Sequence, residues 1–279
     1  MFDRWLQHWR DPKRLPTLGS VQASLEAWYA TPLGQQLLVE QMKVVDEELS
    51  CLFGYHLLQI SVNRQLHLFN NSRIQHRINV GVSLKEEPLA GVDLYSDAHQ
   101  LPLADESVDV TLLHHILEFS PNPHQILKEA SRVTIPRGYI IILGFNRYSL
   151  QGVIKPFARS LTKDPQWRYN TLSPSRVSDW LQFLDCNVVR QRTGFCNLPI
   201  NSRRYLERTN GLAAAMSRLE SSMGNFYCVV ARKDVVGLTP LKPKWSHEAF
   251  IHLGKQGAAA RSAARLSLIK MSGSRRESK

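Results

Sequence analysis

The segment between residues 107 and 143 constrains the fold more than any other part of the chain. Ser107–His114 (SVDVTLLH) is rich in β-branched residues and predicts a buried strand, and Tyr139–Leu143 (YIIIL) predicts another. Asn122–Val133 lies between them with the pattern of a helix, and Pro136-Arg137-Gly138 then turns the chain. Apolar strands joined through a helix are typical of a parallel sheet that is covered on both faces.

Other segments continue this alternation of strands and helices. Thr31-Pro32 predicts the start of an amphipathic helix that runs to about Phe53, where Gly54 would end it. Further strands are expected at 55–62, 78–82, 92–95, 187–191 and 225–231, and further helices at 147–161, 174–184 and 204–222. The last two strands suit an antiparallel pair. The expected fold is α/β, with a doubly wound, mostly parallel, Rossmann-like sheet and helices on both faces.

Composition divides the chain into three parts. Residues 1–30 are expected to form a helical lead-in, residues 31–234 the α/β domain, and residues 235–279 a basic, flexible tail. The whole chain has a net charge of +11, and the tail alone has nine Lys and Arg against two acidic residues, a net +7. Such a tail can attract nucleic acid or an anionic surface, or it can be a solvated appendage. Both readings stay open.

Cysteine and hydropathy patterns exclude several classes of protein. The four cysteines form no C-x-x-C pair, and no His/Cys cluster has the spacing of a zinc site, so neither a disulfide framework nor a metal is expected. No window holds eighteen uncharged apolar residues, and the N-terminal residues are too charged for a signal peptide. We therefore expect a cytoplasmic protein without a membrane span.

Polar residues follow the predicted strands at the edge where an open α/β sheet binds ligands. Ser96-Asp97-Ala98-His99 follows the third strand, His114-His115-Ile116-Leu117-Glu118 the fourth, and Gly144-Phe145-Asn146-Arg147 the fifth. The order of motifs is Asp-Ala-x-x-Leu-Pro, a Ser-Val-Asp strand, His-x-Leu-Glu-Phe, a helix ending Glu-x-x-Arg-Val, and a Pro-x-Gly turn into a strand.

This order resembles the second half of a class I S-adenosylmethionine-dependent methyltransferase domain. Thr31–Gln35, Gly54-Tyr55, Leu58-Gln59 and Gly144–Leu150 are similar to the YafS-like branch of that family, within methyltransferase type 11. The resemblance covers about residues 28–234. It implies a Rossmann-like methyltransferase sheet, S-adenosylmethionine as the cofactor and an unknown methyl acceptor.

The resemblance also implies how the cofactor is held. The carboxylate of Asp97 would accept the adenine amino group, and the backbone N–H of Ala98 would meet a ring nitrogen. Gln59, Ser61 and Leu113 are the further cofactor-binding candidates. The alternative for Asp97 is a turn or a helix N-cap.

The candidates near the reaction centre follow the fourth and fifth strands. His114 and His115 are the catalytic candidates, because an imidazole titrates near neutrality and could take a proton from an oxygen or nitrogen nucleophile. Glu118, Asn146 and Arg147 are candidates for the acceptor side. Either histidine could instead be hydrogen-bonded in the core, Glu118 could cap a helix, and Asn146 could close a loop.

The first strand departs from the family pattern. Methyltransferases of this class usually have a Gly-x-Gly-x-Gly turn there, whereas this chain reads Gln59-Ile60-Ser61-Val62-Asn63-Arg64, with no glycine between Gly54 and Gly81. The acidic residue expected after the second strand is also missing, with Ser83, Glu86 and Glu87 as imperfect substitutes. An inactive methyltransferase-like scaffold that binds a partner protein or RNA through its basic surface is therefore the alternative. A nicotinamide dehydrogenase fits less well, because it needs the glycine-rich turn even more.

Overall fold

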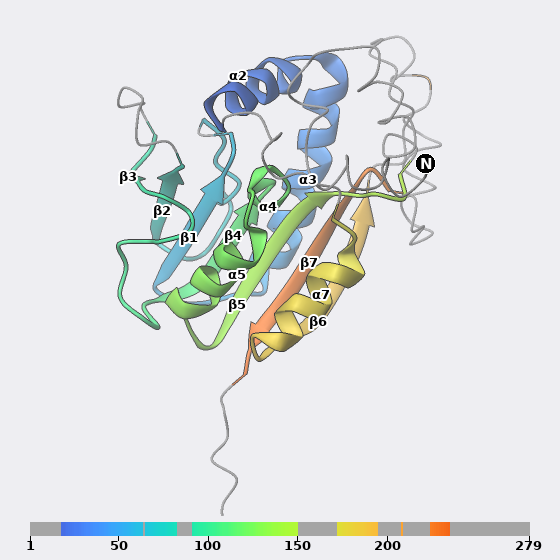
Figure 1. Cartoon of the computed structure of the whole chain (residues 1–279). Helices are drawn as coiled ribbons and strands as arrows, with labels where there is room; N and C mark the ends of the chain where they lie inside the picture. Colours follow the sequence, from blue (N-terminus) through green and yellow to red (C-terminus); the bar gives the residue numbers. More distant parts are fainter. Residues whose placement is uncertain are drawn as a thin grey trace, which may run out of the picture. The chain divides into compact units, whose positions relative to one another are not determined.

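The computed structural model describes residues 18–63, 65–82, 91–149, 172–194, 208 and 224–234. In these residues, seven strands form one sheet in the order β3-β2-β1-β4-β5-β7-β6 (Figure 1). The strands are β1 (His56–Ser61), β2 (His76–Gly81), β3 (Leu94–Tyr95), β4 (Val108–His114), β5 (Thr134–Phe145), β6 (Cys186–Gly194) and β7 (Phe226–Lys233). Neighbours from β3 to β5 pair in parallel, and β7 runs antiparallel to both β5 and β6. The expected doubly wound α/β fold is confirmed.

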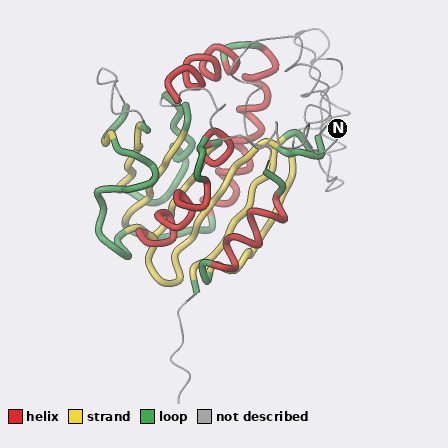
Figure 2. Tube along the Cα trace, viewed as in Figure 1, coloured by secondary structure: helices red, strands yellow, loops and turns green. Residues whose placement is uncertain are grey.

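Helices lie on both faces of this sheet. They are α2 (Leu18–Tyr29), α3 (Pro32–Ser50), α4 (Ile116–Phe119), α5 (Pro123–Val133) and α7 (Pro174–Phe183). Helix α3 lies behind the sheet, and α5 and α7 lie in front of it (Figures 1 and 2). Both faces of the central strands are therefore buried, which explains why β4 and β5 read as continuous apolar segments.

Helix α3 begins where the sequence predicts. The Thr31 hydroxyl accepts a hydrogen bond from the backbone N–H of Gly34 at 3.2 Å, and Pro32 occupies the first helical position. The side chains of Leu37, Val45 and Leu49 are fully buried along one stripe of the helix. Gln41 lies in the same stripe and is fully buried too, so a polar amide enters the core with the leucines.

The end of α3 differs from the prediction. The helix stops at Ser50, and Gly54 lies beyond its C-cap without a left-handed backbone. The reason for a glycine is close approach, since a Cβ at this position would overlap the side chain of Asp109. The Asp109 carboxylate in turn accepts the backbone N–H groups of Tyr55 and His56 at 2.9 and 2.8 Å, which fixes the entry of β1.

The turn Pro136-Arg137-Gly138 lies within β5. Val108 and Val110 of β4 pair with Thr134 and Tyr139, so the intervening residues of β5 bulge out of the ladder. Arg137 has a φ of 67°, a left-handed conformation that favours glycine. The bulge explains why the apolar pattern begins only at Tyr139 although the strand begins at Thr134.

The crossover from β1 to β2 contains no helix among its described residues, 62–63 and 65–75. Hydrogen bonds to the side-chain amide of Gln59 hold this segment, where a helix would be held by its own backbone. The amide oxygen accepts from the backbone N–H of Leu68 at 2.8 Å, and the amide nitrogen donates to the carbonyl of Leu66 and to Asn79. A fully buried side chain thus holds the loop that packs Leu68 into the core.

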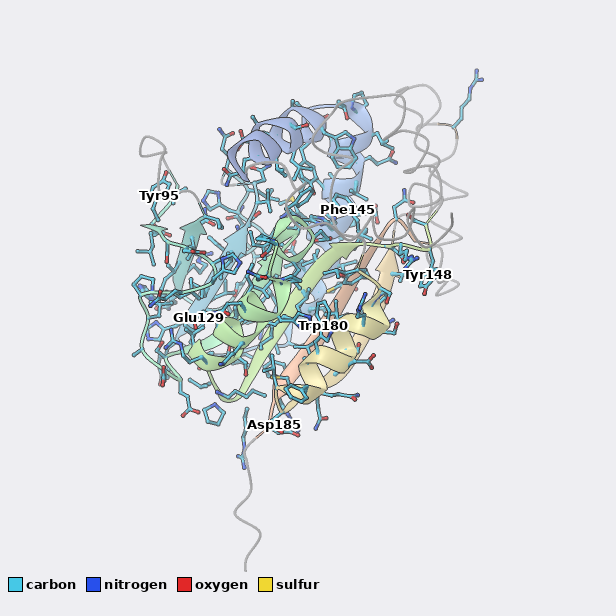
Figure 3. All side chains as sticks on the ribbon, viewed as in Figure 1. Tyr95, Glu129, Phe145, Tyr148, Trp180 and Asp185 are labelled. Carbon is cyan, nitrogen blue, oxygen red and sulfur yellow. The ribbon has the colours of Figure 1, made fainter. Side chains whose placement is uncertain are left out.

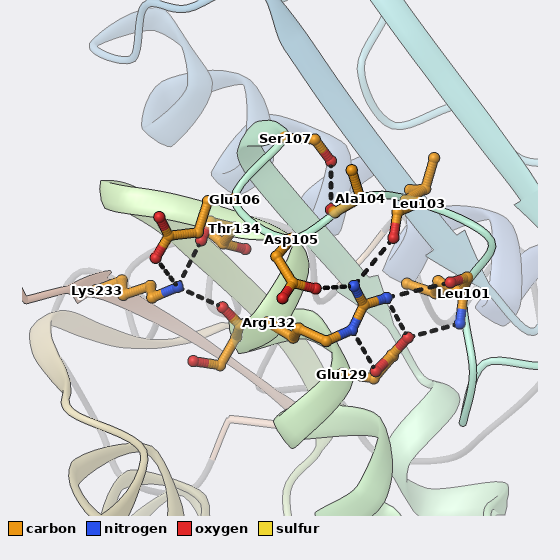
Figure 4. Close-up of polar contacts among 11 residues, drawn as sticks. Leu101, Leu103, Ala104, Asp105, Glu106, Ser107, Glu129, Arg132, Thr134 and Lys233 are labelled. Carbon is orange, nitrogen blue, oxygen red and sulfur yellow. Dashed lines mark hydrogen bonds and ion pairs between the residues drawn. The ribbon is translucent and has the colours of Figure 1, made fainter.

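Arg132, near the end of α5, organises the loop that leads into β4 (Figure 4). Its guanidinium donates to the backbone carbonyls of Leu101 and Leu103 at 3.1 and 3.0 Å, and it pairs with Glu129 and Asp105. The hydrogen bonds that Arg132 donates to Glu129 and Asp105 raise the pKa of Arg132, and the bond from Arg132 lowers the pKa of Glu129 despite its partial burial. The planar fork of an arginine suits this set of four acceptors.

Several sequence predictions fall outside the described residues. They are the helices at 147–161 and 204–222 for nearly all their length, the first seventeen residues, Ser83, Glu86, Glu87, and the tail at 235–279. Among the helices that the structure does describe, none has the length and apolar character needed to cross a membrane.

Arg132→Met is expected to lower the free energy of unfolding by about 2 kcal/mol. The substitution keeps the aliphatic stem but removes charge-assisted hydrogen bonds to two backbone carbonyls and two carboxylates, and partial exposure moderates the cost. Urea denaturation followed by circular dichroism measures the change.

Lys128→Met is the matched control, because Lys128 is exposed on the same helix. It should leave the unfolding midpoint unchanged. Equal midpoints for the two variants would contradict the role assigned to Arg132.

Candidate functional site

Polar side chains gather at the carboxyl ends of β1 and β4. Ser61 and His114 are the last residues of these strands and are register partners in the parallel ladder. His115 and Glu118 follow immediately, in the turn that opens α4. Tyr95 on β3 and Phe145 at the end of β5 mark the same edge of the sheet (Figure 3).

A continuous chain of hydrogen bonds links these residues through Gln41 of α3. The Ser61 hydroxyl lies 2.8 Å from His114 Nδ1, and His114 Nε2 lies 3.3 Å from Gln41 Oε1. The other end of the amide, Gln41 Nε2, lies 2.9 Å from His115 Nε2. His115 Nδ1 lies 3.2 Å from Glu118 Oε1. We call Ser61, His114, Gln41, His115 and Glu118 the edge network.

The edge network is buried throughout. Ser61, Gln41 and His114 have no exposed surface, and His115 and Glu118 are each 1% exposed. Desolvation of this kind makes an unsatisfied polar group costly, so the side chains must satisfy one another. The sequence analysis named His114 and His115 as catalytic, Ser61 as cofactor-binding and Glu118 as acceptor-side candidates. The structure joins these four side chains in one network, and their roles stay predictions.

His115 is held in an unusual backbone conformation. Its φ and ψ are 53° and 14°, in the left-handed region, while its N–H donates to the Leu143 carbonyl at 3.0 Å. Its ring stacks on Phe145, with 3.9 Å between ring centroids. The Phe145 N–H donates to Glu118 Oε1 at 2.6 Å, so β5 fixes both the ring and the carboxylate. A non-glycine residue in this region carries backbone strain, so the contacts around His115 hold it in place.

Burial shifts the acid–base behaviour of the groups around the edge network. It lowers the pKa of His114 well below its usual value, and the neighbouring His115 lowers it further. It raises the pKa of Tyr29 and of Tyr227, and the charge of Glu118 adds to both shifts. Near neutral pH His114 is therefore uncharged and both phenols keep their protons.

Asp97 belongs to a second, more exposed set of contacts after β3. Its side chain is 55% exposed, and its Oδ1 accepts from the backbone N–H of His99 at 2.9 Å and from His99 Nδ1 at 2.6 Å. His99 Nε2 then meets the hydroxyl of Ser120 at 2.9 Å. Partial burial raises the pKa of Asp97, but the backbone and side-chain hydrogen bonds of His99 outweigh it and the net pKa is lowered.

The remaining predicted residues lie apart from these two sets. Gln59 holds the β1–β2 crossover, as described above. Ala98 and Leu113 are buried in the core. Asn146 donates to the Gly224 carbonyl and accepts from the N–H of Tyr148, which joins the end of β5 to the start of β7, and Arg147 is exposed.

Sequence reasoning missed Gln41, His99 and Ser120. A signal existed for Gln41, since it stands four residues from both Leu37 and Val45, in the middle of an apolar stripe. A polar residue in that position must find a buried partner. His99 follows Asp97 by two residues, the spacing of an Asx turn, and could have been read as its partner. Among the described residues, no group of three or more His, Cys, Asp or Glu could hold a metal ion.

Comparison with known proteins shows what the central part of the chain is similar to. Residues 75–142, from the start of β2 into β5, match a family model described as a methyltransferase domain. This part of the chain is similar to a methyltransferase domain. The chain is also 29% identical over 234 residues to YafS, an uncharacterized protein of Escherichia coli K12. The alignment covers 83% of this chain and 90% of YafS.

Two solved structures share the fold of this chain. A protein from Thermotoga maritima, described as a SAM-dependent methyltransferase and possible histamine N-methyltransferase, superposes with a TM-score of 0.55 at 20% identity. The match covers 75% of this chain and 94% of that one. A chain from the complex of the Haloferax volcanii Trm112 methyltransferase activator superposes with a TM-score of 0.52 at 13% identity, covering 78% and 99%.

The burial of His114 predicts a pH dependence of stability. Because its pKa in the folded protein lies below the unfolded value of about 6.5, the unfolded chain takes up the proton first as pH falls. The contribution of His114 is complete above pH 6.5 and is lost below it. Lowering the pH from 7.5 to 5.5 should cost about 1.4 kcal/mol through this residue.

Chemical denaturation at both pH values, in the parent protein and in His114→Gln, measures this contribution. The pH-dependent loss should be smaller in His114→Gln and unchanged in His124→Gln, whose histidine is exposed on α5. Parallel losses in the parent and His114→Gln would show that His114 does not carry the effect.

Proposed function

We propose that the protein is an S-adenosylmethionine-dependent methyltransferase that binds its cofactor at the carboxyl edge of β1–β4. The observation that carries the proposal is the exposed carboxylate of Asp97 just after β3, in a segment similar to a methyltransferase domain. In the sheet of this domain the antiparallel strand β7 lies between β5 and β6. Ligands of open α/β sheets bind at this edge.

The residues after β3 fit the adenine of such a cofactor. Both hydrogen bonds from His99 reach Asp97 Oδ1, so Oδ2 receives neither of them, and the side chain as a whole is 55% exposed. The lowered pKa keeps the carboxylate ionised near neutrality, the form that accepts an amino-group donor. His99, tied to Ser120, orients the carboxylate, and the adjacent Ala98 would supply the backbone N–H.

The turn after β1 is compatible with this proposal despite its lack of glycine. Ile60 and Val62 have no exposed surface. Their branched side chains therefore pack into the core and do not occupy the outer side of the turn. The Ser61 hydroxyl and the Asn63 carboxamide accept the N–H groups of Asn63 and Gln65 at 3.1 Å each. Side chains thus build a turn that related sheets build from glycines, and no described residue of this turn has a positive φ.

A bound cofactor would supply a methyl group activated on a sulfonium. The protein then has to align the acceptor and exclude water, and alignment alone can supply roughly 7–11 kcal/mol. The edge network is buried, and contacts from Gln41 of α3 and Phe145 of β5 hold it in place. It borders the place where transfer would occur. Glu118, Asn146 and Arg147 stay the acceptor-side candidates. The cytoplasmic location and a nucleic-acid partner for the tail also stay predictions.

Isothermal titration calorimetry of the full chain with S-adenosylhomocysteine tests the proposal. We expect micromolar binding, reduced about 10- to 100-fold in Asp97→Ala, because one charge-assisted hydrogen bond is worth roughly 1.5–3 kcal/mol. Asp179→Ala is the matched control, since Asp179 is an exposed aspartate on α7, and it should bind like the parent.

Equal affinities for Asp97→Ala and the parent would remove Asp97 from the site. No binding by the parent at millimolar ligand would overturn the proposal and favour the inactive scaffold. Binding of a single-stranded RNA oligonucleotide that falls steeply with salt, and is lost when residues 237–279 are deleted, would then identify the scaffold's partner class.

A further inference from the structure

We propose that Gln41 is a positioning residue that holds His114 and His115 as neutral rings of opposite tautomer. Glu118, not either histidine, is then the group of the edge network that keeps an acceptor open. The catalytic meaning of this inference rests on the proposed function, whereas the tautomers themselves do not.

The direction of the hydrogen bonds is set at the Glu118 end. An ionised carboxylate can only accept, and Glu118 Oε1 already accepts the N–H of Phe145 at 2.6 Å. The hydrogen between His115 and Glu118, 3.2 Å apart, therefore belongs to His115 Nδ1. In the neutral ring, His115 Nε2 is then an acceptor, and it faces the amide nitrogen of Gln41 at 2.9 Å.

The same logic continues along the network to β1. Because the Gln41 nitrogen donates to His115, its oxygen faces His114 Nε2 and must accept, so His114 carries its hydrogen on Nε2. His114 Nδ1 is then an acceptor for the Ser61 hydroxyl at 2.8 Å. The Ser61 oxygen accepts the N–H of Asn63 at 3.1 Å, which leaves its own hydrogen for His114. Each donor in the chain meets one acceptor.

The reverse direction needs an additional proton at its last step. If Gln41 were turned around, His115 Nε2 would donate to the amide oxygen and Nδ1 would present a lone pair to Glu118 Oε1. Two acceptors 3.2 Å apart repel unless Glu118 carries a proton or His115 is an imidazolium. The reversed direction therefore needs one proton more than the direction proposed here, on Glu118 or on His115.

This arrangement assigns different roles to the candidate residues. Both nitrogens of His114 and both of His115 are engaged, so neither ring has a lone pair for the methyl acceptor. Glu118 Oε2 is buried and has no hydrogen-bond partner among the described residues. Buried polar atoms are nearly always satisfied, so this oxygen is where a donor from a bound group fits.

Nuclear magnetic resonance of the histidine rings tests the inference on the full-length, ligand-free protein. Two-bond ¹H–¹⁵N correlations at pH 7.5 distinguish the two neutral tautomers from the imidazolium, and His114→Gln and His115→Gln assign the signals. We expect His114 protonated on Nε2, His115 protonated on Nδ1, and neither ring charged.

Gln41→Glu supplies a readout that a merely structural role would not move. The substitution replaces the donor facing His115 Nε2 with an acceptor, so His115 should become an imidazolium between two carboxylates at pH 7.5, while His114 keeps its Nε2 hydrogen. Gln35→Glu adds the same charge at an exposed position of α3 and should leave both rings neutral.

Like tautomers, reversed tautomers or a charged ring in the parent protein would each overturn the inference, and the parent spectrum decides even if Gln41→Glu does not fold. A Gln41→Glu variant whose His115 stays neutral would also overturn it. Because the spectra need no cofactor, failure of S-adenosylhomocysteine to bind would contradict the proposed function and leave the tautomer result intact.

Discussion

Two histidines are buried side by side at the carboxyl end of β4, and the residues around them must supply hydrogen bonds to both rings. Water reaches neither ring, and neither can remain unpaired at low cost in a low-dielectric interior. One carboxamide, that of Gln41, meets both rings because its oxygen and nitrogen point in opposite directions. The position of α3 over the sheet is thus fixed by a specific pair of hydrogen bonds as well as by its leucine stripe.

Hydrogen bonds to polar side chains also hold the β1–β2 crossover. A parallel pair of strands normally needs a helix between them, and the backbone of a helix satisfies itself. Here the described part of the β1–β2 crossover lacks a helix, and Gln59, Ser61 and Asn63 supply the hydrogen bonds instead. The absence of glycines after β1 and the absence of this helix are therefore one feature. Side chains here make hydrogen bonds of the kind that the backbone of a helix makes in a helical crossover.

Sequence patterns predicted the strands and their class because burial on two faces leaves a continuous apolar record. They also brought His114, His115 and Glu118 to one edge, because these follow the same strand. They could not pair Ser61 with His114, since that contact depends on which strands are neighbours in the sheet. Nor could they explain Gly54, whose reason is the side chain of Asp109, a residue distant in the sequence.

The two polar sets at this edge differ in the way their proposed tasks require. Asp97 is exposed and ionised, as a group that receives a ligand from solvent must be. The edge network is buried and hydrogen-bonded from end to end, with Glu118 Oε2 left to accept a donor, as suits the proposed wall of a reaction centre. Helix α4 joins them, because Glu118 lies within it and Ser120, the partner of His99, directly follows it. A shift of α4 would move the hydrogen-bond partner of His99 and the carboxylate of Glu118 together. The proposed recognition of a cofactor and the proposed orientation of an acceptor thus both involve one short, buried element.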